Sequence, residues 1–220
     1  KEMIRHTLHN QFFCITYPST TEIYTLYLHD ALPIYHNPRN VWRPIFFDNS
    51  HSSVRLLDII HFPDYNVHFI YGASCNSSLE KEESVQRQLK KEFCNDFHPI
   101  SPACVTHQLM GMRFMQRHEC GDQTMVKEVV STLQDKIVSQ LTWDPRVVDV
   151  YLQRVLMLLD SGAREQIKHV WIRSVINAQL NNGGWSGSEA LFPVGGGKYF
   201  SFTSKVIGVR KIKSDFHASA

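Results

Sequence analysis

Apolar residues recur at helical spacing over much of the chain after residue 76. In the segment 123–141 they fall at offsets of 0, 4, 7, 11 and 15, on one face of a helix. These residues are Val126, Val130, Leu133, Ile137 and Leu141. Comparable apolar positions predict further helices over 77–94, 102–117, 144–161 and 164–180. The pattern therefore predicts a mainly α fold made of antiparallel helical hairpins.

Polar residues suited to capping a helix precede three of these segments. Ser77 followed by Glu80 matches a capping box, in which side chains and backbone N–H groups satisfy one another. Ser101-Pro102 and Asp144-Pro145 each combine a capping side chain with a proline that suits the first helical turn. We expect helices to begin at these positions, and Gly162 to end the helix that starts at Asp144.

The flanking segments are less regular. Residues 36–75 hold apolar pairs separated by prolines, which predicts a poorly defined lead-in with one short helix near 53–61, then loop or extended chain. Residues 181–214 are rich in Gly and Ser, which predicts a long Gly-rich loop or a short hairpin. Ser214 or Asp215 would cap a sixth helix, so the helical domain is expected to span 76–220 and to be truncated at its C-terminus.

The N-terminal segment has a separate character. Residues 21–34 resemble the peptide obtained when a common sequencing adapter is translated. Residues 1–35 are therefore interpreted as an artefactual or disordered segment, with a short natural strand or loop as the alternative.

Composition and charge narrow the function classes only slightly. The chain is 43% hydrophobic and 20% charged with a formal charge of +2, which indicates neither a nucleic-acid partner nor a membrane surface. No apolar run is long enough for a membrane span. The glycines at 195–197 precede Lys198 and then Tyr199 rather than Ser or Thr, so they do not match a phosphate-binding loop. No cofactor is indicated.

A basic stretch near the C-terminus has two interpretations. It contains Lys205, Arg210, Lys211 and Lys213, with Tyr199 and Phe202 nearby. Such residue types bind anions or single-stranded nucleic acid. Cations in a loop more commonly form a solvated face, and we expect no nucleic-acid partner.

One motif resembles a known family. The run Gln179-Leu180-Asn181-Asn182-Gly183-Gly184-Trp185 is similar to the glutamine–tryptophan repeat of squalene-hopene and related triterpene cyclases. The resemblance implies a partial α/α toroid, in which Gln179 bonds helix-end carbonyls and Trp185 packs against a neighbouring helix. In that family the motif is structural. The family's D-x-D-D acid motif is absent from this sequence.

Two functional hypotheses follow. The first is an exported binding or structural module, for which we expect an apolar, filled core. The second is an enzyme of the cyclase or lyase kind with its active site in a toroid cavity, for which carboxylates or histidines should converge. Asp215, His217 and Trp185 are the candidate cavity residues, because the loop after the motif and the next helix start would share one end of the barrel.

The cysteines are better explained by disulfides than by a metal site. His107 and His118 lie on one predicted helix, roughly 16 Å apart at about 1.5 Å per residue, so they cannot join Cys104 and Cys120 around one zinc ion. In a hairpin of the helices 77–94 and 102–117, Cys94 meets Cys104 at the loop end and Cys75 meets Cys120 at the open end. Nested bridges would imply a secreted or periplasmic protein. The alternative is four reduced thiols in a cytoplasmic protein.

Overall fold

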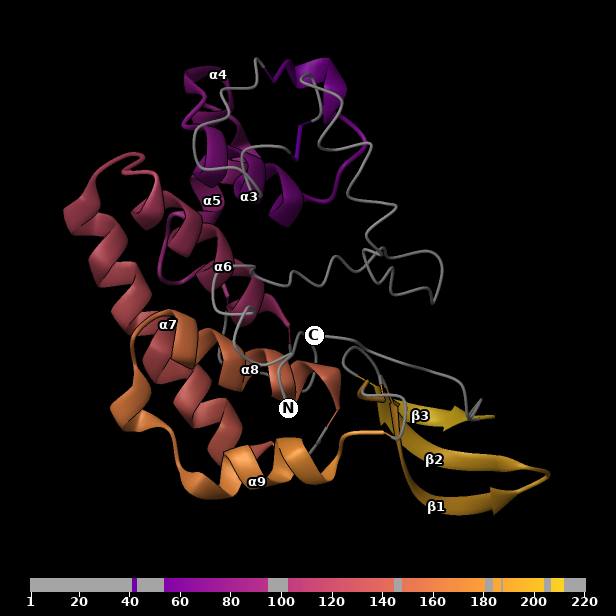
Figure 1. The fold of residues 1–220 in the computed structure, drawn as a ribbon. Helices are drawn as coiled ribbons and strands as arrows, with labels where there is room; N and C mark the ends of the chain where they lie inside the picture. Colours follow the sequence, from indigo (N-terminus) through magenta and orange to yellow (C-terminus); the bar gives the residue numbers. More distant parts are fainter. Residues whose placement is uncertain are drawn as a thin grey trace, which may run out of the picture.

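The computed structural model describes residues 41–42, 54–94, 103–144, 148–180, 184–186, 188–203 and 207–211. They form a mainly helical body followed by a small antiparallel sheet (Figure 1). The helical elements are η1 (Leu56–Asp58), α3 (Asp64–Ser74), α4 (Ser77–Glu80), α5 (Glu83–Gln88), α6 (Cys104–Arg117), α7 (Gln123–Trp143), α8 (Asp149–Asp160), η2 (Arg164–Gln166) and α9 (His169–Asn177). The strands are β1 (Ser188–Gly195), β2 (Lys198–Thr203) and β3 (Ile207–Arg210).

Helices α3 and α6 run parallel and lie very close together. Near their starts, the rings of Tyr65 and His107 stack with 4.5 Å between centroids. Further along, a Cβ atom at Gly72 would lie 2.8 Å from the carbonyl oxygen of Gly111, and a Cβ at Gly111 would overlap the ring of His68. The two glycines therefore allow the backbones to approach more closely than any larger residue would permit.

Helix α8 lies beside α6 and runs in the same direction. Thr106 Oγ1 lies 3.4 Å from Gln153 Oε1 near the starts of the two helices. Arg113 Nε donates to Asp160 Oδ2 at 3.0 Å near their ends. Helices α3, α6 and α8 are therefore three parallel helices, with α6 contacting both of the others.

Helix α7 runs antiparallel to α6. Its first residue, Gln123, donates from Nε2 to the carbonyl oxygens of Met115 and Cys120 near the end of α6. Further along α7, Lys136 donates to the carbonyl of Cys94, which is bonded to the first residue of α6. The side chain of Asp122 caps α7 by accepting from two backbone N–H groups.

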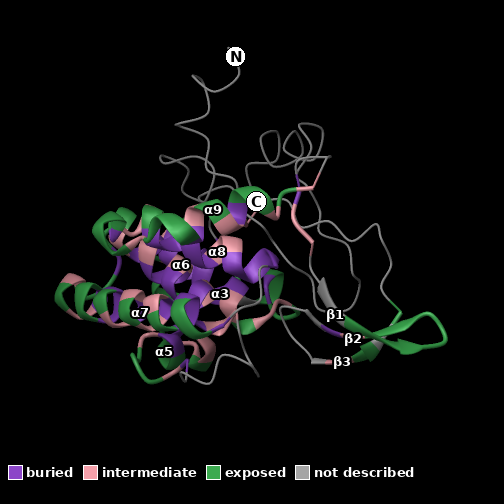
Figure 2. Cartoon of the chain, turned by 90° about the horizontal axis from the view of Figure 1, so that it is seen from below, coloured by how far each residue is buried: buried purple, intermediate pink, exposed green. Residues whose placement is uncertain are grey.

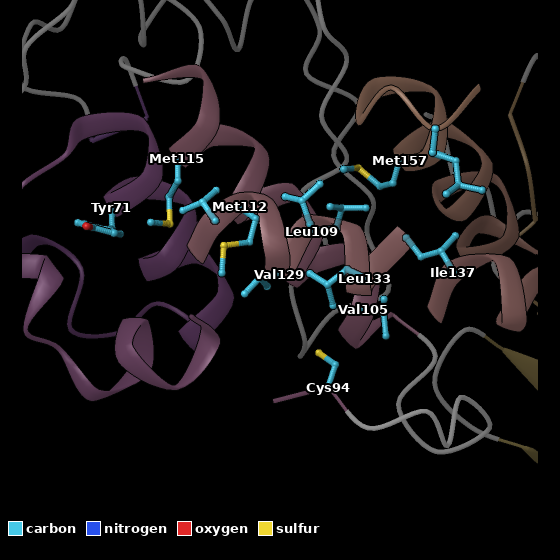
Figure 3. Close-up of a cluster of buried hydrophobic side chains, with 14 of the residues drawn as sticks. Tyr71, Cys94, Val105, Leu109, Met112, Met115, Val129, Leu133, Ile137 and Met157 are labelled. Atoms are coloured by element: carbon cyan, nitrogen blue, oxygen red, sulfur yellow. The ribbon is translucent and has the colours of Figure 1, made fainter. Parts of the chain in front are cut away.

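A continuous core lies among these helices (Figure 3). All five residues of the apolar stripe predicted for 123–141 are buried in it, so that prediction is confirmed. Helix α9 contributes Trp171 and Val175. Other buried members are Tyr71, Leu109, Met112, Met115, Val129 and Met157.

The prediction of loop or extended chain before residue 75 is wrong, because residues 64–74 form α3. The helix starts directly after Pro63, and every residue from Asn66 to Ala73 is buried. A helix buried on all sides has no polar face, so no amphipathic period marks it in the sequence. The short helix expected near 53–61 is reduced to the three residues of η1.

Several predicted helix boundaries also differ. The helix expected over 77–94 is split into α4 and α5, and α4 is capped by the side chain of Asn76 rather than Ser77. Asp144 ends α7 instead of beginning α8. The helix expected over 164–180 is divided between η2 and α9. Gly162, with φ of 86°, follows the end of α8 as predicted.

The Gly-rich segment after residue 187 forms a three-stranded sheet in the order β1-β2-β3 rather than one long loop. Strands β1 and β2 are joined at Gly196-Gly197, and Gly195 pairs with Lys198. Both turn residues have positive φ, 59° and 69°, which suits the tight turn of a two-residue hairpin. The sixth helix expected from Ser214 or Asp215 falls outside the described residues.

Two disulfides join the helices. Cys75 bonds Cys120 with 5.2 Å between Cα atoms, and Cys94 bonds Cys104 with 5.6 Å. The pairs match the nested arrangement expected from the sequence, but the helices involved differ. Cys75 directly follows α3, so its bridge joins the C-terminal ends of two parallel helices, α3 and α6, rather than the open end of an antiparallel hairpin.

Candidate functional site

The loop after α9 holds the one candidate cavity residue that the structure describes. The indole N–H of Trp185 donates to the carbonyl oxygen of Val175 in α9 at 2.7 Å. Leu180 N–H donates to the carbonyl of Gly184 at 2.8 Å, which closes the loop. Trp185 is partly buried against the core. It therefore acts as a packing residue that also satisfies a helix-end carbonyl, the role that the sequence assigned to Gln179.

Asp215 and His217, the other two cavity candidates, lie outside the described residues. The structure therefore places neither of them relative to Trp185.

A buried ion pair links α7 to α8. Arg154 is fully buried, and its Nη1 donates to Asp144 Oδ2 at 2.9 Å. Its Nε donates to Gln140 Oε1 at 3.1 Å. A buried guanidinium needs such partners because the interior offers little solvation. This cluster links α7 to α8 and is almost completely buried, so it offers little surface to a ligand.

His68 is the second unusual polar group in the interior. It is fully buried between α3 and α6, and neither ring nitrogen has a hydrogen bond of normal geometry. Burial lowers the pKa of His68 to about 4, and the neighbouring Gln88 amide offsets part of that effect. The imidazole is therefore neutral in the folded protein at neutral pH. Its lack of access to solvent argues for a packing role.

The cysteines and histidines once considered for a metal site are used otherwise. Cys104 and Cys120 form disulfides, and His107 stacks on Tyr65. Among the described residues, no group of three or more His, Cys, Asp or Glu side chains is arranged to hold a metal ion.

An exposed apolar row crosses the sheet. Phe192 of β1 pairs with Phe200 of β2, which pairs with Val209 of β3. The two phenylalanine rings stack with 5.1 Å between centroids. Phe192 is 54% exposed and Val209 is 55% exposed, although both are apolar. We call these three residues the apolar row.

The two faces of the sheet differ. Ser201 follows Phe200 in β2 and so points to the opposite face, where it is fully buried and bonds the carbonyl of Gly208. The apolar row thus occupies the open face. Near the hairpin turn, Val194 and Tyr199 are also exposed, at 47% and 39%. Figure 2 shows the hairpin as a mainly exposed projection beside the buried centre of the helical body.

The segment that forms the sheet carries a modest positive charge. Residues 188–211 contain four cations and one acid, Glu189 of β1. The whole chain has 23 cations and 21 acids, so the remainder has 19 cations and 20 acids, a charge of −1. Lys198 and Lys211 are exposed beside the apolar row. The sheet therefore combines a row of exposed apolar side chains with positive charge. The helical body also has exposed apolar side chains, among them Val170 and Ile176 of α9.

The chain matches no protein-family model, no curated protein and no solved structure. In the described parts of the chain, no helix combines the length and the apolar character needed to cross a membrane. What the protein does must therefore be inferred from its own residues.

Proposed function

We propose that this protein is an exported helical module that works by binding, and that the open face of the β1-β2-β3 sheet is its binding surface. The observation that carries the proposal is the apolar row. Phe192 and Val209 are more than half exposed, whereas the apolar residues of α6 and α7 are mostly buried. Exposed aromatic and aliphatic side chains gathered on one face are typical of interaction surfaces.

The disulfides support export. Disulfides persist mainly in oxidising compartments, outside the cytoplasm. Each of the four cysteines from residue 75 onward is used in one of the two bridges. A secreted or periplasmic protein is the setting in which this arrangement is stable.

The filled core favours a binding module over an enzyme. Side chains from α3, α6, α7, α8 and α9 form one continuous apolar cluster where a toroid enzyme would need a polar cavity. The most buried charged group in the described chain, Arg154, is paired within that body. These features support a body that holds the sheet in place and takes no part in chemistry.

We further propose that the body is part of an α/α toroid. The parallel set α3, α6 and α8, with α7 antiparallel beside α6, is the arrangement that successive helical hairpins produce. The contact of Trp185 with Val175 agrees with the packing role that the glutamine–tryptophan motif implies.

The binding proposal is tested with the intact chain and a sheet variant. Phe192→Thr/Val209→Thr removes two members of the apolar row while keeping residues that suit a strand. The matched control is Val170→Thr/Ile176→Thr, which removes two exposed apolar side chains from α9. Binding is measured to anionic vesicles, polyglutamate, a sulfated polysaccharide and single-stranded DNA.

We expect the native protein and the α9 control to bind at least one of these four probes, and the sheet variant to bind it more weakly. Equal binding by all three proteins would overturn the assignment of the sheet as the surface. Absence of binding to every probe would overturn the proposed function.

A further inference from the structure

We infer that Asn76 is an acceptor site for an N-linked oligosaccharide. Asn76, Ser77 and Ser78 form the pattern Asn-X-Ser with X other than proline, which is the acceptor motif for this modification. No other Asn in the 220 residues of the chain is followed two positions later by Ser or Thr. The inference rests on the proposed export of the protein and does not depend on what the sheet binds.

The motif lies at the surface, in the connection between α3 and α4. Ser77 and Ser78 are exposed, and Asn76 is partly exposed. The flanking residues Cys75 and Glu80 are exposed as well. An oligosaccharide is bulky and hydrophilic, so it needs an attachment point at the surface. Among the described residues, the neighbours of Asn76 in the chain leave room for one.

The hydrogen bonds of Asn76 are compatible with an attached sugar. Its Oδ1 accepts from the backbone N–H of Ser78 at 2.9 Å, and its Nδ2 donates to the carbonyl oxygen of Val54 at 2.9 Å. Attachment leaves Oδ1 unchanged and replaces one of the two hydrogens on Nδ2. The remaining hydrogen is sufficient for the single bond to Val54. The modified side chain can therefore keep both contacts in the folded protein.

The transfer balances with a lipid-linked oligosaccharide diphosphate as the sugar donor. Asn76 Nδ2 forms a bond to the anomeric carbon of the sugar, and the bond from that carbon to the diphosphate oxygen breaks. Nδ2 loses one proton to a base of the transferring enzyme. The lipid diphosphate leaves with the electron pair of the broken bond, so nothing is oxidised or reduced.

The order in which the chain is exported places this modification before folding. Cys75 bonds Cys120, which lies 45 residues later, so α3 and α6 are not joined until residue 120 has also been exported. During that interval the motif belongs to an unfolded chain, in which Nδ2 is not yet bonded to Val54. The hydrogen bond of the folded protein therefore does not shield Asn76 from the transferring enzyme.

The site is well separated from the proposed binding surface. Asn76 directly precedes α4 (Ser77–Glu80). Figure 1 shows α4 at the top of the molecule and the three strands at the lower right. A sugar on Asn76 would therefore leave the apolar row open, and the modification is compatible with binding through the sheet.

The test uses the full chain, placed behind a cleavable export signal and produced in eukaryotic secretory cells. We expect the native protein to migrate more slowly on a denaturing gel than its sequence predicts. An amidase that removes N-linked sugars should abolish this shift. The same enzyme converts the modified Asn76 to Asp, which mass spectrometry of the peptide identifies. Cells and medium are both sampled, so that modified chains are detected whether or not they are released.

Two neighbouring serines provide a matched pair of variants. Ser78→Ala removes the hydroxyl that the motif requires and should abolish the modification. Ser77→Ala changes another exposed serine, at the position where the motif accepts any residue except proline, and should leave the modification in place. Ser78→Thr keeps a hydroxyl and should also retain it. Because the sugar is attached before folding, the comparison does not require that each variant folds.

An unmodified native chain would overturn the inference. If both disulfides have formed in that chain, the proposed export and the binding by the sheet are left standing, whereas free cysteines would overturn the export as well. Equal modification of the two alanine variants would also overturn the inference, because the motif would then not direct the attachment of the sugar.

Discussion

The helical body and the projecting sheet use their apolar residues in opposite ways. In the body, apolar side chains from five helices are buried together, and two disulfides close the chain around them. In the sheet, Phe192 and Val209 remain exposed on a face that no described residue covers in full. Among the strand residues whose burial is described, Ser201 alone is buried, so the sheet adds little to the buried core. The difference is consistent with a body that supplies the stability and with the sheet as the proposed contact surface.

The largest expected effect comes from breaking the buried ion pair in the body. Asp144→Ala leaves the guanidinium of Arg154 buried without its carboxylate partner, so the free energy of unfolding should fall by roughly 3–5 kcal/mol. Asp160→Ala is the control, since its pair with Arg113 is about a quarter exposed and should cost less than about 1 kcal/mol. Urea unfolding of both variants measures the difference, and equal losses would contradict it.

Removal of the disulfides should have the next largest effect on the free energy of unfolding. The loss should differ between the two bridges because they close loops of different length. Cys75→Ser/Cys120→Ser opens a loop of 45 residues and should cost about 4 kcal/mol by the chain-entropy relation. Cys94→Ser/Cys104→Ser opens a loop of 10 residues and should cost about 3 kcal/mol. Guanidinium unfolding under oxidising conditions gives both values. A larger loss for the shorter loop would show that local packing, not loop length, decides the contribution.

His68 makes the stability of the body depend on pH. Its pKa is about 4 in the folded protein against an ordinary value of 6.5, so the unfolded chain binds the proton more readily. Stability should therefore be highest above pH 6.5 and decline as the pH falls toward 4, by about 3 kcal/mol in total. Unfolding is measured across this range. His68→Leu should remove this part of the decline, and an unchanged profile would rule out His68 as its source.

The smallest expected effect is on the sheet. Phe192→Thr/Val209→Thr replaces exposed side chains, so the loss of stability should be about 0.5–1 kcal/mol, mainly from the stack of Phe192 on Phe200. Thermal unfolding compares this variant with the native chain. A loss of several kcal/mol would mean that the sheet is part of the stabilising core, and the contrast between the two regions would disappear.

Sequence periodicity predicted the helices that have both a buried and a solvated face. Helix α7 is the clearest case, because its apolar stripe from Val126 to Leu141 is buried and its opposite side faces solvent. Helix α3 has no such contrast, since its residues 66–73 are all buried, and it was missed. The disulfide pairs were predicted from an antiparallel hairpin of helices 77–94 and 102–117. In the structure the Cys75–Cys120 bridge instead joins the ends of the parallel helices α3 and α6. The predicted pairs still match, because α3 brings Cys75 to the end of α6 that the hairpin would have reached.

The candidate surface was much harder to foresee. The alternation of polar and apolar residues at 198–202 and the nearby cations are evident in the sequence, but they are equally typical of a solvent-exposed loop. The apolar row depends on a cross-strand register that aligns Phe192, Phe200 and Val209. That register is set by the turn at Gly196-Gly197 and by irregularities in β1, which are three-dimensional properties of the hairpin. Trp185, in contrast, was expected to pack against a helix and does so.

The bridge between Cys75 and Cys120 also has a mechanical consequence. If the chain is pulled from its two ends, tension reaching residue 75 passes through the sulfur–sulfur bond directly to residue 120. The 45-residue loop between them then bears no load, and helix α6 within it cannot be stretched. Because the Cys94–Cys104 bridge still shortcuts 10 residues of this loop, reduction of the Cys75–Cys120 bond alone would release roughly 120 Å of additional contour, at about 3.4 Å per residue. The oxidised protein is therefore a shorter and stiffer tether than its sequence length suggests.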